Sequence, residues 1–426
     1  MFKDSIYVKN EIAAFAFPGR PSAYWPAVEK RKDADIFHTS FESEYPLKKL
    51  DSIATGNLAY SPILVVPETA PKVAITESDL EDYPGMFLEG TGSAVLRGIF
   101  AGYPLEEETT GGLYPEMKVT KRAPYIARTK GSRSFPWRVM LIAAEDRELP
   151  NNDIVYRLGS PSRLKETSWI KPGKLTDEWI IDLNLFNVPF RAGLNTASYK
   201  YYIDFAKRFG FDRIMMDAGW SDNSDLFKIN PDINMDTLVA YAKEKGIGIS
   251  MWTLSMTLDR QLDSALDRFN RWGVDFIMTD FIDRDDQKTV NFYYRIAKAC
   301  AEHKIMIMYH GAFPPKGFNR TYPNAVSRDS GPFDLFKLGF KAYREGNKQE
   351  AVEAYRYAAE KGHTGSRWAL ATMYADGDGV VKNDYEAFKI YAEIANQGVE
   401  PGSNDTGFFV NALMALPFVI RVVEPA

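Results

Sequence analysis

The middle of the 426-residue chain alternates short apolar runs with longer amphipathic stretches, and this alternation restricts the folds open to it. Runs of this length and character are typical of buried parallel strands; they cover residues 214–216, 247–251, 274–279 and 305–308. The intervening stretches repeat apolar residues at a spacing near 3.6, which predicts helices; they cover residues 196–209, 234–245, 259–272 and 287–303. We therefore expect a parallel α/β domain in this region.

The predicted strands end in acidic or aromatic residues. Asp280 is the clearest case, because it closes a nearly unbroken apolar run and a buried, unpaired carboxylate is costly. In barrels of alternating strands and helices, the catalytic groups lie at the carboxyl ends of the strands. Aromatic faces and carboxylates together suit a sugar, so the strand ends predict a sugar site; its candidates are Asp217, Trp220, Trp252, Asp280 and His310. Two alternatives stay open, since Asp217 can be a helix N-cap and His310 a histidine satisfied at a strand end.

The first 175 residues have a different texture. Short apolar stretches such as residues 63–66, 86–88 and 138–142 are separated by Pro, Gly, Asn and Asp. This pattern favours an antiparallel β-sandwich. We predict a partial β-sandwich domain over residues 1–175, a (β/α) barrel region over 176–331 and a helical repeat region over 332–426.

The last region contains an internal repeat at an offset of 36 residues. Ala351 and Tyr355 recur as Ala387 and Tyr391 in the same register. A period of this length predicts stacked helix pairs, a short α-solenoid. Residues 333–415 resemble the Sel1-like, tetratricopeptide-related repeats, and that resemblance implies a surface for a protein partner.

Composition narrows the classes further. The formal charge of −5 and the pI near 5.6 argue against nucleic acid as a partner. The single cysteine, Cys300, excludes a disulfide within the chain and is expected to be a buried packing thiol. The opening residues 1–5 lack the apolar region of a signal peptide. The apolar run 408–423 is short and broken by Pro417, so no membrane span is predicted.

Motifs spread over residues 10–329 resemble glycoside hydrolase family 97, in its retaining branch. They occur in the family's order, at residues 77–86, 135–139, 169–174, 193–196, 199–205, 217–220, 280–287, 310–312 and 319–324. The resemblance implies an N-terminal β-sandwich packed on a (β/α)₈ barrel, acting on oligosaccharides or other α-glycosides as an α-galactosidase or α-glucosidase. It also implies a calcium ion near the substrate and a periplasmic or secreted location in bacteria.

The resemblance assigns roles to individual residues. It implies that Asp280 is the nucleophile of a double-displacement mechanism, which retains the anomeric configuration. It implies that Asp217 and Trp220 shape the sugar subsite and that His310 reaches the sugar.

Two further assignments concern calcium. Glu77 and Asp329 match positions that ligate calcium, an ion that binds carboxylate oxygens; the alternative is that Glu77 is a plain surface residue. Asp283, Asp285 and Asp286 form an acidic run that is more often a solvated helix entry, where acidic side chains favour the helix dipole.

The chain departs from the family pattern after residue 329. Leu335 occupies the position where the family carries its acid/base Glu, and strands six to eight have no counterpart. We therefore expect a barrel truncated after about five strands. The predicted activity is a retaining α-glycosidase that is weakened or inactive for want of the acid; the alternative is a non-catalytic carbohydrate-binding or scaffold protein.

Overall fold

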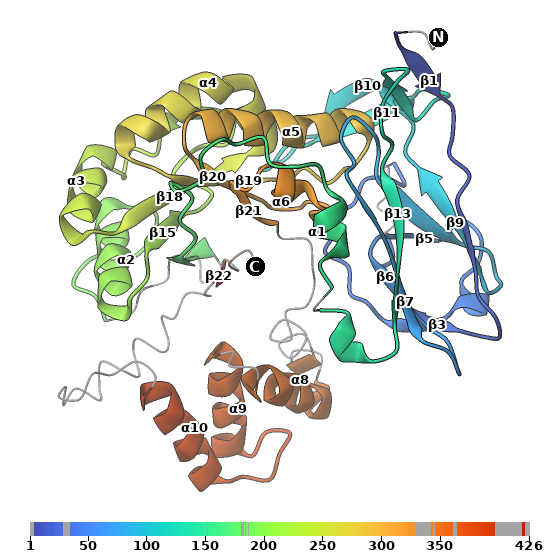
Figure 1. The fold of residues 1–426 in the computed structure, drawn as a ribbon. Helices are drawn as coiled ribbons and strands as arrows, with labels where there is room; N and C mark the ends of the chain where they lie inside the picture. The colour runs from blue at the N-terminus through green and yellow to red at the C-terminus, as the bar shows by residue number, and fades with distance from the viewer. Residues whose placement is uncertain are drawn as a thin grey trace.

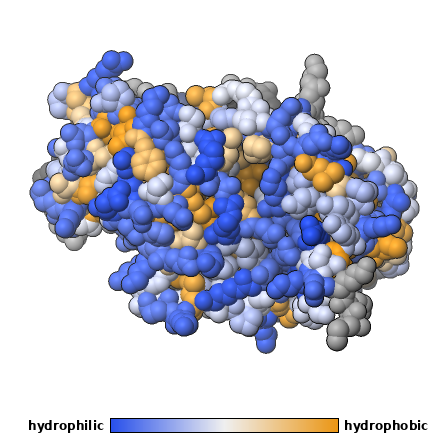
Figure 2. Space-filling model, turned by 90° about the horizontal axis from the view of Figure 1, so that it is seen from above, coloured by the Kyte–Doolittle hydropathy of each residue, from blue (hydrophilic) through white to orange (hydrophobic). Residues whose placement is uncertain are grey.

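The structure is a computed structural model that describes most of the chain. It covers residues 4–28, 35–150, 152–179, 183, 185, 187–328, 342–343, 346–360, 364–396 and 420–421. Figure 1 shows a β-rich part in blue and cyan beside a parallel sheet with helices in green to orange. Among the described residues no helix is both long enough and apolar enough to cross a membrane. On the face drawn in Figure 2, hydrophobic residues occupy small separate areas among hydrophilic ones.

The N-terminal part is built from antiparallel strands. A five-stranded sheet has the order β13-β7-β6-β3-β4, and a four-stranded sheet has the order β2-β9-β8-β5. Trp25 and Ile75 of one sheet region share a buried core with Leu88 and Leu96 of the other. Two sheets facing one core form the β-rich domain that the sequence predicts.

The strands and short helices of this part have the following bounds: β1 (Ile6–Val8), β2 (Ala14–Ala16), β3 (Ser22–Tyr24), β4 (Leu47–Lys49), η1 (Leu50–Ser52), β5 (Leu58–Tyr60), β6 (Ile63–Val66), β7 (Lys72–Ser78), β8 (Met86–Gly90), β9 (Val95–Phe100), β10 (Pro104–Thr109), β11 (Met117–Arg122), β12 (Ala127–Thr129), β13 (Trp137–Ala143), η2 (Asp146–Glu148) and α1 (Ile154–Leu158). The pairs β1-β12 and β10-β11 form separate two-stranded ladders.

The second part is a partial parallel half-barrel. Its sheet has the order β21-β20-β19-β18-β15-β14-β22, in which the neighbours from β21 to β14 are parallel and β22 is antiparallel. The strands are β14 (Lys174–Thr176), β15 (Arg213–Met216), β18 (Gly248–Leu254), β19 (Phe276–Asp280), β20 (Met306–Tyr309), β21 (Ala325–Arg328) and β22 (Ile420–Arg421). A small hairpin, β16 (Ser221–Asp222) and β17 (Asp225–Ile229), follows β15.

The expectation of about five strands was too low, because the described residues contain six parallel ones. The two short outer strands, β14 and β21, were missed because three or four residues give no usable pattern. β14 also straddles the boundary expected between residues 175 and 176.

The predicted helices are present. They are α2 (Thr196–Phe209), α3 (Met235–Lys245), α4 (Ser255–Trp272) and α5 (Gln287–Glu302), with a short α6 (Phe318–Thr321) after β20. Asn195, Asn234 and Asp286 each accept a backbone N–H as the N-cap of the helix that follows. α4 begins four residues before its predicted start and is non-helical at Gln261.

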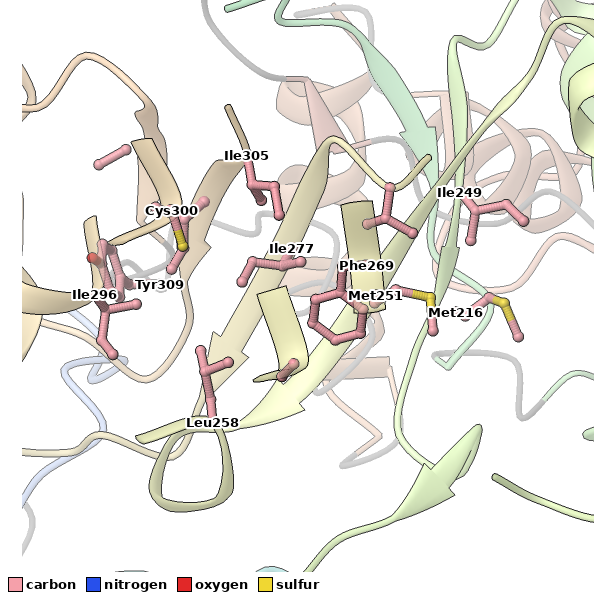
Figure 3. Close-up of a cluster of buried hydrophobic side chains, with 14 of the residues drawn as sticks. Met216, Ile249, Met251, Leu258, Phe269, Ile277, Ile296, Cys300, Ile305 and Tyr309 are labelled. Atoms are coloured by element: carbon pink, nitrogen blue, oxygen red, sulfur yellow. The ribbon is translucent and has the colours of Figure 1, made fainter. Parts of the chain in front are cut away.

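The helices cover the outer face of the sheet. Met251 and Ile277 on the strands pack with Phe269 of α4 and Ile296 of α5 (Figure 3). Cys300 of α5 is fully buried in the same cluster, as predicted for a packing thiol. Burying such side chains contributes about 1.5–3 kcal/mol each, so this layer holds the sheet in place.

The inner face of the sheet carries the alternate residues of the same strands. Met278 and Asp280 lie on this face of β19, and Trp252 and Leu254 lie on that of β18. Successive side chains of a strand point to opposite faces. The inner face is therefore apolar along its length and becomes polar at the carboxyl ends, where Asp280 ends β19.

The loop after β19 joins the two parts. The backbone oxygen of Asp283 accepts the N–H of Thr39 at 2.9 Å, and that of Asp285 accepts the N–H of Gly85 at 2.9 Å. Asp286 caps α5 and also pairs with Arg284 at 2.9 Å.

The expectation of a solvated acidic run was therefore wrong. Asp283, Asp285 and Asp286 are all at most 3 % exposed, because the N-terminal domain packs over them.

The third part contains the three helices α8 (Lys348–Glu360), α9 (Thr364–Asp376) and α10 (Asp384–Asn396). The repeat places Ala351 in α8 and its counterpart Ala387 in α10, and α9 packs against both helices. Thr372 of α9 and Tyr391 of α10 share a hydrogen bond at 2.9 Å. Asp329, Leu335 and the apolar run 408–423, except for β22, lie outside the described residues, so the complete solenoid and its Sel1-like character stay predictions.

Candidate active site

Asp280 is held by three donors at the carboxyl end of β19. The Trp252 indole N–H donates to Asp280 Oδ2 at 3.1 Å, and the Phe281 backbone N–H donates to Oδ1 at 2.6 Å. His310 Nδ1 lies 3.0 Å from the same Oδ1, a hydrogen bond in which the imidazole carries the proton. The carboxylate is 13 % exposed, so it is fixed in orientation yet open to a ligand.

An aromatic wall lines one side of Asp280. Tyr114, from the loop between β10 and β11, stacks on Phe281 with ring centroids 4.9 Å apart and an angle of 9°. The same ring meets Trp252 edge to face at 5.9 Å. Tyr114 belongs to the N-terminal domain, so both domains contribute apolar surface beside the carboxylate. Such surface suits the apolar face of a sugar ring.

His310 follows β20 and connects two carboxylates. Its Nδ1 lies 3.0 Å from Asp280 Oδ1 and 3.7 Å from Glu42 Oε1, and its side chain is 31 % exposed. The next residue, Gly311, has φ of +55°, and a Cβ there would lie 2.7 Å from Asp283 Oδ1. A glycine is needed at this position because the loop after β19 approaches it closely and its φ is positive. The structure thus brings His310 to Asp280, and a contact between His310 and a sugar stays a prediction.

Asp217 follows β15 and belongs to a buried acidic group. Burial and, after it, the nearby carboxylates of Asp177 and Asp280 raise the pKa of Asp217 to about 7. The Glu178 carboxylate accepts the Asp217 backbone N–H at 2.9 Å. The pKa of Glu178 is also raised well above its usual value, because the side chain is fully desolvated. A carboxyl of this kind can keep its proton near neutral pH, and the protonated group can donate a hydrogen bond to a hydroxyl.

Trp220 follows β15, but its side chain does not face the candidate site. Its side chain is fully buried in the outer core, where the ring packs against Phe269 and Trp272. Its indole N–H donates to the backbone oxygen of Trp252 at 2.8 Å. The prediction that Trp220 binds the substrate directly is therefore corrected: the side chain supports the strand that carries Trp252.

Glu77 does not present a calcium site. The side chain is fully buried, and its two oxygens accept hydrogen bonds from the side chains of Arg138 and Lys316. The Met86 backbone N–H donates to both oxygens, at 2.9 and 3.0 Å. Two cations on one carboxylate repel a third, so these residues do not fit Ca²⁺. The alternative of an exposed surface Glu77 is also wrong, and Asp329 lies outside the described residues.

One group in the described part of the chain is close enough to hold a metal ion. Its ligand atoms, from His38, Glu116 and Asp283, all lie within 4.8 Å of one another. His38 Nε2 is 2.6 Å from Glu116 Oε2 and 3.8 Å from Asp283 Oδ2, at the junction of the domains. An imidazole with two carboxylates suits a transition metal better than calcium. The direct contact at 2.6 Å is also what a hydrogen bond between the imidazole and the carboxylate gives without a metal ion between them.

Sequence reasoning missed several residues of this site. Asp177 and Glu178 follow β14 as Asp217 follows β15, so the short strand was the signal that would have found them. Tyr114 and Glu42 lie in loops of the N-terminal domain. No local pattern marks those two residues, because the fold alone brings them to the strand ends.

Comparison with known proteins agrees with this architecture. Residues 2–161 match the family description Glycosyl-hydrolase 97 N-terminal, and residues 178–331 match Glycoside hydrolase 97. A retaining alpha-galactosidase of Bacteroides thetaiotaomicron is 37 % identical over 331 residues, which are 76 % of this chain and 50 % of that protein. The chain thus spans about half the length of this relative.

Two further matches are a structural match over most of the chain and a sequence match over a shorter stretch of it. A glycoside hydrolase family 97 enzyme from Pseudoalteromonas sp. strain K8, solved with acarbose, has a TM-score of 0.61 at 24 % identity. The alignment covers 77 % of this chain and 51 % of that one, and it supports the fold. An exopolysaccharide production negative regulator of Rhizobium leguminosarum is 81 % identical over 91 residues, which are 21 % of this chain and 34 % of that protein.

The two family matches follow each other along the chain in the order in which the β-rich domain and the half-barrel occur. The retaining alpha-galactosidase relative aligns over a length that needs both parts. Through its N-terminal and catalytic domains, the chain belongs to glycoside hydrolase family 97.

Proposed function

We propose that the chain is a retaining α-glycosidase of the α-galactosidase or α-glucosidase type, with Asp280 as its nucleophile. The observation that supports this most directly is the fixed, partly exposed Asp280 carboxylate at the end of β19. Three donors orient it, and an aromatic wall stands beside it. The retaining alpha-galactosidase relative favours a galactoside as the first substrate to test.

The side chains around Asp280 are proposed to bind the sugar and to position the nucleophile. Asp217, with a pKa of about 7, is suited to donate a hydrogen bond to a sugar hydroxyl. Trp252 and Tyr114 offer aromatic surface to the ring, and His310 keeps Asp280 in position. The proposed covalent step joins an Asp280 oxygen to the anomeric carbon, and water then releases the sugar.

By the family resemblance, Leu335 stands at the acid/base position, and a leucine side chain cannot donate a proton. General acid catalysis contributes roughly 10²–10⁴-fold, so we expect slow hydrolysis of unactivated disaccharides. Aryl glycosides release a stable phenolate, so the loss of the general acid should slow their hydrolysis least. A retaining α-glycosidase weakened in this way should hydrolyse 4-nitrophenyl α-galactoside far faster than melibiose.

Replacement of the nucleophile tests the proposal. Asp280→Ala should abolish turnover of 4-nitrophenyl α-galactoside, and added azide should restore it with a β-galactosyl azide product. The inverted product arises because azide attacks the face that Asp280 otherwise occupies. Asp263→Ala, at an exposed position of α4, is the matched control. Full activity of the Asp280→Ala variant would remove Asp280 from the mechanism.

A non-catalytic role is the second candidate. The described helices α8 and α10 carry the 36-residue repeat, and the chain spans half of its galactosidase relative. These observations favour a carbohydrate-binding or scaffold protein whose repeat helices recruit a protein partner. Saturable binding of galactose without turnover of the nitrophenyl substrate would support this role.

A further inference from the structure

A loop of the N-terminal domain reaches the strand ends of the half-barrel and is fixed there. The Thr39 N–H donates to the Asp283 backbone oxygen at 2.9 Å. Phe41 is fully buried, with its ring 6.3 Å from Phe313 and 5.3 Å from Tyr60. Phe313 lies in the loop that also carries His310, so residues 39–43 contact the loops after both β19 and β20.

Glu42 lies between two anchored neighbours. Phe41 holds its N-terminal side in the core, as described above. On its C-terminal side, the Ser43 N–H donates to the Tyr60 hydroxyl at 2.8 Å, and that hydroxyl donates to the Ser43 backbone oxygen at 3.2 Å. The backbone on both sides of Glu42 is therefore held, while its side chain remains 39 % exposed.

The Glu42 and Asp280 carboxylates approach the same nitrogen atom. His310 Nδ1 lies 3.0 Å from Asp280 Oδ1 and 3.7 Å from Glu42 Oε1. The two oxygens can be no farther apart than the sum of these two distances. The two carboxyl groups of retaining glycosidases are about 5–5.5 Å apart, and this separation is below that upper limit.

We propose that Glu42 is the catalytic acid and base that works with Asp280. This inference rests on the proposed glycosidase function and replaces the acid that Leu335 cannot supply. In the first step Asp280 bonds to the anomeric carbon, the glycosidic C–O bond breaks, and the Glu42 proton passes to the departing oxygen. In the second step Glu42 takes a proton from water, whose oxygen displaces Asp280 from the anomeric carbon.

Exposure and position favour Glu42 over the other carboxyls near Asp280. Asp217 is 8 % exposed and Asp283 is 3 % exposed, so both are shielded from water. An acid that becomes a base in the second step must exchange protons with solvent, and Glu42 is placed to do so. Because it belongs to another domain, we expect its catalysis to be weaker than that of an acid on a barrel strand.

Three substrates separate the role of the acid from that of the nucleophile. α-Galactosyl fluoride needs no protonation of its leaving group, 4-nitrophenyl α-galactoside needs little, and melibiose needs it fully. The intact chain should hydrolyse all three, with melibiose slowest. Glu42→Gln should lower kcat/KM for melibiose by about 10²–10⁴-fold and change that for the fluoride far less. Glu44→Gln, an exposed change of the same kind two residues away, should leave all three rates unchanged.

Azide provides a readout that a structural role of Glu42 would not produce. In Glu42→Gln the galactosyl-enzyme should accumulate, and azide should release it as α-galactosyl azide with retained configuration. The Asp280→Ala variant should give the β-azide instead.

Each remaining outcome contradicts a stated part of the scheme. An unchanged melibiose rate in Glu42→Gln, or native chain that cleaves the fluoride without cleaving melibiose, would overturn the role of Glu42 and leave Asp280 as nucleophile. If Asp217→Asn forms α-galactosyl azide and Glu42→Gln does not, the acid and base is Asp217 and not Glu42. Failure of the intact chain to cleave even the fluoride would overturn the glycosidase function itself, and the role of Glu42 with it.

Discussion

Replacement of Asp217 by asparagine should stabilise the folded chain above about pH 7 while lowering its turnover. Burial first, and then the charges of Asp177 and Asp280, raise the pKa of Asp217 from 3.8 to about 7. The folded chain therefore binds this proton more tightly than the unfolded chain does. The contribution of Asp217 to stability is fully present below about pH 4 and is lost as the pH rises to about 7.

The size of this loss follows from the shift. One pKa unit corresponds to 1.36 kcal/mol, so a shift of about three units is worth on the order of 4 kcal/mol as an upper limit. The amide of the asparagine side chain cannot ionise, so the variant should keep this free energy at pH 8. Structural relaxation around the charged group reduces the expected gain to roughly 1–3 kcal/mol.

Urea unfolding at pH 5 and pH 8, followed by tryptophan fluorescence, measures the effect. The native chain should lose more stability between these two pH values than Asp217→Asn does. Asp263→Asn removes a charge from an exposed position of α4 and should keep the native pH dependence. If the native chain and Asp217→Asn lose the same stability between these pH values, the conclusion that burial raises the pKa of Asp217 is refuted. Turnover of the nitrophenyl galactoside should fall in the same variant, because a polar contact to the sugar changes.

Four other predictions concern stability, metal binding and thiol reactivity. Lys316→Met should lower the free energy of unfolding by about 3–5 kcal/mol, since it leaves the buried Glu77 with one cation fewer; urea unfolding would show it, and a change within error would mean that Arg138 suffices. Gly85→Ala should destabilise the contact between the domains, because a Cβ there would lie 2.0 Å from Asp285 Oδ2; a native melting temperature would contradict this packing. Added calcium should leave the melting temperature unchanged, because Lys316 and Arg138 already occupy Glu77; a rise would show that a calcium site exists. Cys300 should react with a thiol reagent only on unfolding, since it is fully buried and its pKa is raised; rapid reaction of the folded chain would contradict this packing.

The middle of the fold could be predicted because its signals are local. The spacing in α2, α3 and α5 and the apolar runs of β18 and β19 each mark their own element within a few residues. The meeting of Asp280, Trp252 and His310 also followed from the pattern, because the carboxyl ends of parallel strands share one edge.

The errors arose where a second domain or a turn decides the outcome. Trp220 follows the same strand end as Asp217, yet Gly219 with φ of +103° redirects the chain and the ring enters the core. Asp283, Asp285 and Asp286 read as solvated because the sequence does not show that the N-terminal domain will cover them. Glu42 carries no local signal, since its place beside His310 depends on contacts far apart in the chain.

Under the proposed function, the loop after β19 makes catalysis depend on the contact between the two domains. It begins at Asp280 and, within a few residues, is hydrogen-bonded to Thr39 and Gly85 of the N-terminal domain. Separation of the two domains would therefore release the loop that follows Asp280, the proposed nucleophile, even with the half-barrel still folded. The proposed activity should disappear at a lower urea concentration than helix content does, because the β-rich domain supplies contacts that the candidate active site needs.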